Sequence, residues 1–224
     1  MPLSVVKQGS VLGQVFDSLK SAIMMGEFEP SQKLRIDELA DAFGTSHMPV
    51  REALGQLVVL GALESPPRRS VHVPKLSVEK LTDLMELRLL LETRAVELAA
   101  EAATPALIAR LKKHHRGMGD LLERKALNLS AYLKLNYEFH FAIYEASGNA
   151  ELIDMIETIW LRYGPMLNLL REKAWLGEGN QDHAEMIEGL ERGDRARLQR
   201  GLQSDLNRAM NAITRGIASQ EAAE

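Results

Sequence analysis

The sequence predicts a mainly α-helical protein with a small N-terminal part and a larger C-terminal bundle of antiparallel helices. Apolar residues recur at three- and four-residue spacing along most of the 224-residue chain. Residues 34–73 read as two short helices around a glycine turn, followed by a turn-rich hairpin. After Pro74 the helical periodicity continues almost without interruption. We therefore expect one domain over residues 1–74 and a second over residues 75–224.

Composition excludes several classes of protein. The chain has no cysteine, so it has neither disulfides nor a thiolate metal site. Its N-terminus lacks the basic start and apolar run of a signal peptide, and no apolar run approaches the ~20 residues of a membrane span. We expect a soluble cytoplasmic protein. The net charge of −4 argues weakly against nucleic acid, and up to Lys75 eight bases balance eight acids. Binding to DNA must therefore depend on where the bases lie.

The N-terminal elements are marked by caps and glycines. Ser10 caps a first helix that ends before Gly26, Gly44 stops a second one, and Ser46 caps a third with Pro49 in its first turn. The expected helices span residues 10–25, 34–43 and 46–61, and the expected strands 62–64 and 71–73, joined by the tip SPPRRS. This order is that of a winged helix-turn-helix with a small β-hairpin wing, which places one helix in the DNA major groove.

The C-terminal part is predicted as an antiparallel all-α bundle that follows a short linker, Val73–Ser77. Its helices begin at residues that commonly cap helices, including Thr104 before Pro105, Asn128 and Asp194. The expected helices span residues 77–103, 105–125, 129–147, 150–171, 182–192 and 195–218, with a loop at 172–181.

Basic residues at the predicted recognition helix and wing favour DNA binding. A helix N-terminus such as Ser46 suits a phosphate, because free backbone N–H groups point outward there. Arg51, one turn further along, suits a bidentate contact with guanine. Arg68 and Arg69 at the wing tip suit the minor groove or phosphates.

Residues 12–73 resemble the N-terminal domain of GntR-family transcription regulators. The resemblance lies in TSHMPVREAL (45–54), preceded by LADAFG and followed by LVVLGALES. It implies a DNA-binding set that comprises Ser46, His47, Met48, Arg51, Arg68 and Arg69. His47 and Met48 replace the usual Arg and Thr of the family, and Ser70 stands where the wing usually has Gly.

Residues 77–215 resemble the FCD ligand-binding domain of the FadR subfamily. The matching segments are LMELRLLLETRAVELAAEAAT (84–104), LNYEFHFAIYEASGN (135–149) and QDHAEMIEGLERGDRARL (181–198). Many members of this subfamily bind a divalent metal through one Asp and three His. Carried over residue by residue, this set falls on Asn136, His140, His183 and Asp205, with Asn in place of the usual Asp and Asp in place of one His.

The implied donor set is chemically reasonable. Asn136 and His140 are one helical turn apart and share a face. Two imidazoles and a carboxylate can hold Zn, Ni, Mn or Fe as divalent ions and leave positions open for another ligand. A metal-free polar pocket, in which Asn136, His140 and His183 hydrogen-bond the effector directly, is the alternative. Arg88 is the favoured carboxylate clamp, ahead of Arg94 and Arg162.

Taken together, the sequence predicts a transcription regulator that binds a palindromic operator as a homodimer. The resemblance implies repression controlled by a small organic acid, bound in the C-terminal domain at Arg88, Asn136, His140 and His183. A metal-responsive regulator, in which the ion is the signal, is one alternative. A metal-dependent hydrolase is another, which the absence of an HExxH motif disfavours. No organic cofactor and no membrane partner are expected.

Overall fold

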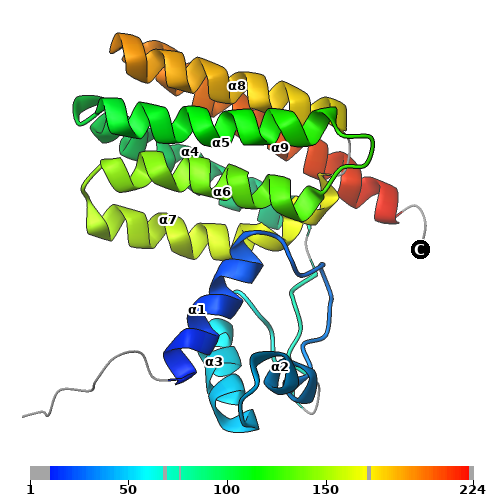
Figure 1. The fold of residues 1–224 in the computed structure, drawn as a ribbon. Helices are drawn as coiled ribbons and strands as arrows, with labels where there is room; N and C mark the ends of the chain where they lie inside the picture. The colour runs from blue at the N-terminus through cyan, green and yellow to red at the C-terminus, as the bar shows by residue number, and fades with distance from the viewer. Residues whose placement is uncertain (1–10, 68–69, 76, 171–172, 222–224) are drawn as a thin grey trace, which may run out of the picture.

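The structure is a computed structural model that describes residues 11–67, 70–75, 77–170 and 173–221. A small group of three helices lies below a larger stack of helices (Figure 1). A single cluster of buried apolar side chains runs from Val15 in the small group to Ile217 in the stack. The fold is mainly helical, as predicted. No helix in the described ranges is both long and apolar enough to cross a membrane.

The small group contains α1 (Val11–Met24), α2 (Ile36–Phe43) and α3 (His47–Val59). Gly44 ends α2 in the left-handed conformation, with φ 60°, which glycine adopts without a steric cost. Ser46 precedes α3 in an extended conformation, but its side chain makes no capping hydrogen bond. The expected helix-turn-helix is therefore present, and the hydroxyl of Ser46 is not used to cap α3.

The expected β-hairpin wing is not confirmed, because no strand is assigned in the described part of the chain. Glu64 and His72 form one antiparallel bridge, with N···O distances of 2.9 and 3.0 Å, and His72 also bridges to Lys33. Pro66 and Pro67 lie two and three residues after Glu64 and have no N–H to donate, so the pairing cannot extend as a ladder toward them. Arg68 and Arg69 lie outside the described residues.

The upper stack is an all-α bundle. Side-chain caps mark the starts of several helices: Ser77 accepts from the Lys80 N–H at 3.2 Å, and Thr104 accepts from Leu107 at 3.2 Å. The elements are α4 (Val78–Glu101), α5 (Pro105–Glu123), α6 (Leu129–Ala146), α7 (Ala150–Tyr163), the 3₁₀ helix η1 (Gly164–Leu169), α8 (Lys173–Arg192) and α9 (Arg195–Glu221).

Two predicted element boundaries are wrong. Residues 172–181 were expected to form a loop, but α8 already begins at Lys173. Tertiary contacts outweigh the poor helix propensity of this glycine-rich segment, since Tyr132 donates to the Leu176 carbonyl and His115 contacts the Asn180 carbonyl. The helix expected over 150–171 ends at Tyr163, where Pro165 removes an N–H and the chain continues as η1.

The two parts pack directly against each other through η1. The amide of Asn168 donates to the carbonyl oxygens of Gly26 and Phe28, at 2.5 and 2.9 Å. Gly164 lies so close to the end of α1 that an added Cβ would be 2.8 Å from the Met24 Cα. Nearby, Arg162 Nε donates to the carbonyl of Leu60, just after α3. The division at residue 74 stays a prediction, but contact between the parts is not limited to a linker.

Candidate functional site

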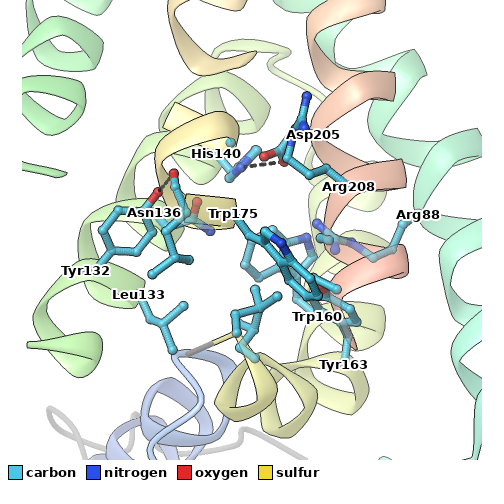
Figure 2. Close-up of a pocket in the computed structure, with 16 residues that line it drawn as sticks. Arg88, Tyr132, Leu133, Asn136, His140, Trp160, Tyr163, Trp175, Asp205 and Arg208 are labelled. Atoms are coloured by element: carbon cyan, nitrogen blue, oxygen red, sulfur yellow. Dashed lines mark hydrogen bonds and ion pairs between the residues drawn. The ribbon is translucent and has the colours of Figure 1, made fainter. Parts of the chain in front are cut away.

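A cavity of about 520 Å³, counting the part open to solvent, lies inside the helical bundle. Helices α4, α6, α7, α8 and α9 and the segment η1 all contribute to its wall. Asn136, His140 and Asp205 lie on one side of the hollow, with Trp160 and Tyr163 below them (Figure 2). The cavity combines an apolar floor with a few polar groups, as ligand sites commonly do.

His140, His183 and Asp205 meet beside this cavity from α6, α8 and α9. The Nε2 atoms of the two histidines are 3.2 Å apart. Asp205 Oδ2 is 3.3 Å from His140 Nε2, and Oδ1 is 3.5 Å from His183 Nε2. Both histidines are buried, with exposed fractions of 1% and 0%. The structure therefore brings together three of the four residues in the predicted metal set, and the fourth, Asn136, lines the cavity one turn before His140.

The two histidines are held differently. His140 Nδ1 lies 3.2 Å from the hydroxyl of Tyr144, one turn along α6. His183 Nδ1 is buried without a hydrogen-bond partner in the part of the chain that the structure describes. The ring of His183 instead packs on Phe139, with centroids 4.4 Å apart. His140 is thus oriented by a hydrogen bond and His183 by packing.

A buried carboxylate, Glu92, organises the groups behind His140. Its Oε1 accepts from Arg88 Nε at 2.7 Å and from Trp160 Nε1 at 2.8 Å. Its Oε2 accepts from the Tyr144 hydroxyl at 2.5 Å and from Arg88 at 3.3 Å. The side chain has no exposed area, so its charge is compensated entirely by these donors.

Arg88 lines the cavity as predicted but already has a carboxylate partner. Its guanidinium pairs with Glu92 and lies over the rings of Trp160 and Tyr163, at 4.5 and 4.2 Å from their centroids. Burial opposes its charge, but Glu92 outweighs this effect and raises the pKa of Arg88. Neither alternative clamp lines the cavity: Arg94 pairs with Glu97, and Arg162 donates to the Leu60 carbonyl.

Sequence reasoning missed Glu92, Tyr144 and Arg208. Arg208 brings a second guanidinium to the cavity wall and is paired with Asp182 at 2.9 Å and with Glu178. Helical spacing was an available signal, because Glu92 and Tyr144 lie four residues after Arg88 and His140, and Arg208 lies three after Asp205.

Burial also sets the protonation of these groups. Burial lowers the pKa of His183 to about 3, and Asp205 only partly offsets this effect. Burial alone would raise the pKa of Asp205, but the adjacent His140 and the charges of nearby residues lower it below its usual value. Burial and the charge of Glu92 raise the pKa of Tyr144 well above 10, so the phenol keeps its hydrogen.

The three clustered residues fit a divalent transition metal. Ligand atoms that surround zinc tetrahedrally at 2.0–2.1 Å are roughly 3.3 Å apart. The three separations observed here are 3.2, 3.3 and 3.5 Å. Two imidazoles and one carboxylate are also a donor set that Zn, Fe and related ions accept. The same distances allow hydrogen bonds, so a metal-free polar pocket is compatible with this geometry as well.

Four of the predicted DNA-binding residues, Ser46, His47, Met48 and Arg51, lie at the N-terminal end of α3. Arg68 and Arg69 lie outside the described residues. Arg51 is exposed, and Met48 is 62% exposed. His47 Nε2 is 3.4 Å from Asp37 Oδ1, so this ring nitrogen already contacts a carboxylate on α2. A hollow beside this helix end is lined by Arg35, Asp37, His47, Arg51, Ser65 and Ser70, among others.

Comparisons with known proteins agree with the two-part organisation. Residues 12–73 match the family model described as "Bacterial regulatory proteins, gntR family", and residues 83–208 match the FCD domain model. The HTH-type transcriptional regulator McbR of Escherichia coli is 34% identical over 75% of each chain. The Nta operon transcriptional regulator of Aminobacter aminovorans is 35% identical over 59% of this chain and 61% of that protein.

A solved structure of E. coli McbR/YncC has the same fold. It superposes with a TM-score of 0.87 at 29% identity and covers 93% of this chain and 99% of the other. The relatives are transcription regulators and not enzymes. The expectation that this protein has no enzymatic activity is thereby confirmed, and the hydrolase alternative is set aside.

Proposed function

We propose that this chain is a repressor that a small organic acid releases from its operator. The chain belongs to the gntR family of bacterial regulatory proteins and carries an FCD domain. That it is a transcription regulator follows from the family. The sign of regulation, the effector and the metal are parts of the proposal. Membership of the FadR subfamily is also proposed, because the FCD domain fits it.

The DNA contact is assigned to the N-terminal end of α3 and to the basic residues predicted for the wing. Arg51 is the base-reading residue, because it is exposed one turn into the helix and can bond guanine bidentately. Ser46 and His47 contact phosphate, and Met48 offers an apolar contact. Arg68 and Arg69, which lie outside the described residues, keep the DNA-contacting role predicted from the sequence.

A palindromic operator implies two copies of the reader. Leu87 and Leu90 on α4 support a homodimer, because they are 47% and 67% exposed on the outside of the bundle. A second copy that covers α4 would bury both side chains. Light scattering on the purified protein measures the mass of the particle in solution and tests this part.

The observation that carries the effector proposal is the buried cluster of His140, His183 and Asp205 beside a cavity. These residues would hold a divalent transition metal, with Asn136 as a weaker fourth donor. The ion would supply a positive centre with open positions for a carboxylate. Arg208, on the cavity wall, adds a hydrogen-bond donor to an acid held there.

The segment η1 is proposed to link the cavity to the reader. Leu167 lines the cavity, whereas Gly164 and Asn168 in the same segment pack on the turn after α1. A ligand that displaces η1 would therefore move α1 directly, in addition to any effect through residues 73–77.

The first test measures metal content and operator affinity together. Protein purified without chelator or metal-affinity tag is expected to carry about one transition metal per chain. His183→Ala should lose this metal while its circular dichroism stays unchanged. Stoichiometric metal in that variant would locate the metal elsewhere. In fluorescence anisotropy with operator DNA, metal-chelating acids should release the wild type but not the variant. Release by metal alone would instead identify the ion as the signal.

A further inference from the structure

His140 has an oxygen atom on each side of its ring. Nδ1 lies 3.2 Å from the hydroxyl oxygen of Tyr144, and Nε2 lies 3.3 Å from Asp205 Oδ2. A neutral imidazole has one N–H donor and one lone pair, so it can donate to only one of these oxygens. Which nitrogen carries the hydrogen decides which nitrogen can bind a metal.

The hydrogen bonds behind His140 determine this choice. The hydroxyl of Tyr144 has a single hydrogen, and it donates that hydrogen to Glu92 Oε2 at 2.5 Å. Glu92 cannot donate in return, because donors from Arg88 and Trp160 occupy it as an acceptor. The oxygen of Tyr144 is therefore an acceptor toward His140, and the hydrogen lies on Nδ1.

With its hydrogen on Nδ1, the neutral ring presents a lone pair at Nε2. This lone pair faces the carboxylate of Asp205 at 3.3 Å and His183 Nε2 at 3.2 Å. A neutral His183 carries a single N–H and can donate to only one of these two acceptors, so the other is left without a donor in a buried site. A metal ion bound at Nε2 supplies a positive charge there and leaves the Nδ1–H bond to Tyr144 intact.

We propose that Glu92 and Tyr144 are positioning residues that dedicate Nε2 of His140 to the metal. Arg88 belongs to the same unit, because it holds the Glu92 carboxylate in place from one turn away on α4. This inference rests on the proposed metal site. It also gives Arg88 a role that differs from the effector clamp predicted from the sequence.

The test combines zinc affinity with the protonation of His140 in the full chain. Zinc affinity is measured by competition with a chromophoric chelator, and ¹⁵N NMR of labelled histidine reports which ring nitrogen carries hydrogen. Tyr144→Phe removes the hydroxyl and is expected to weaken zinc binding ~10–100-fold. Tyr137→Phe is the matched control, because it removes a hydroxyl from the same helix outside the Glu92 network.

A second variant, Glu92→Gln, reverses the chain of hydrogen bonds. Its amide would donate to Tyr144, whose hydroxyl would then donate to Nδ1, so the hydrogen of His140 would move to Nε2 and zinc affinity would fall. This variant keeps the test informative if Tyr144→Phe does not fold.

Wild-type protein is expected to show a slowly exchanging Nδ1–H on His140, with and without zinc. A wild type that binds zinc but has no hydrogen on Nδ1 overturns this inference alone. Wild-type zinc affinity in Tyr144→Phe also overturns it. A wild type that binds no zinc overturns the proposed metal site, and the positioning role with it.

Discussion

The DNA-reading end and the cavity of this protein use charged side chains in opposite ways. Arg51, at the start of α3, is exposed and free to turn toward a duplex. Arg88 and Glu92 have side-chain exposures of 3% and 0% and are fixed by each other and by the aromatic rings around them. The first region keeps its charges available for a partner, and the second uses them to hold its own shape.

This contrast predicts which property, DNA affinity or stability, a substitution in each region should change. Removing an exposed charge costs only its external contact, whereas removing one member of a buried pair leaves the other without compensation. Substitutions at the DNA-reading end should therefore leave the fold intact and weaken DNA binding. Substitutions in the Glu92 network should mainly lower the stability of the protein.

Arg88→Met is expected to give the largest effect. It leaves the carboxylate of Glu92 in the core without its charged partner, and breaking a buried pair in this way lowers the free energy of unfolding by ~3–5 kcal/mol. Arg94→Met on the same helix is the control, because Arg94 is exposed and Glu97 only partly buried, and such surface pairs contribute ~0–1 kcal/mol. Urea unfolding measures both. Equal losses in the two variants would contradict the contrast between buried and exposed charge.

Arg51→Ala should leave stability unchanged and weaken operator binding, with a loss of discrimination of ~1–3 kcal/mol for one bidentate guanine contact. Anisotropy titrations with operator and with a scrambled duplex measure the discrimination. Arg35→Ala, in the same hollow, is expected to weaken both duplexes equally. If Arg51→Ala discriminates as the wild type does, Arg51 does not read bases.

Acid should destabilise the metal-free protein through His183. Its pKa is lowered to about 3 in the fold, against ~6.5 in the unfolded chain, so the unfolded state binds more protons between these values. Stability should therefore fall as the pH drops below about 6.5, by on the order of 1 kcal/mol at pH 5.5. The lowered pKa of Asp205 acts only below its usual value near 3.8.

Urea unfolding at pH 7.5 and 5.5 tests this expectation in chelator-treated protein. His183→Gln removes the group that takes up the proton, so its stability should change less between the two pH values. A wild type with the same stability at both pH values would show that His183 does not titrate in this way.

The sequence predicted local features well. Glycine and serine signals around α2 and α3 act over a few residues: Gly44 ends α2 and Ser46 precedes α3, although the Ser46 side chain makes no capping hydrogen bond. The resemblance to known regulators supplied the metal set, and the structure brings together His140, His183 and Asp205 from three different helices.

Features that depend on tertiary packing were not predicted. Residues 173–181 are helical because α8 packs on its neighbours, whereas the low helix propensity of the glycines in that segment predicted a loop. Arg88 was taken for a free clamp because its partner, Glu92, appeared only within the segment 84–104 that resembles the FCD domain. The network behind His140 joins α4, α6 and α7, and no segment of the sequence contains it.

The position of η1 has a consequence for how the protein would respond in a cell. This segment is both a wall of the cavity and the surface on which α1 rests, through Leu167 on one side and Gly164 and Asn168 on the other. If an effector lowers operator affinity by some factor, operator DNA must lower effector affinity by the same factor. Operator DNA then acts as an allosteric effector that lowers ligand affinity at the cavity. Copies of the protein bound to DNA would sense the acid at higher concentrations than free copies, so the threshold of the response depends on how many operators are occupied.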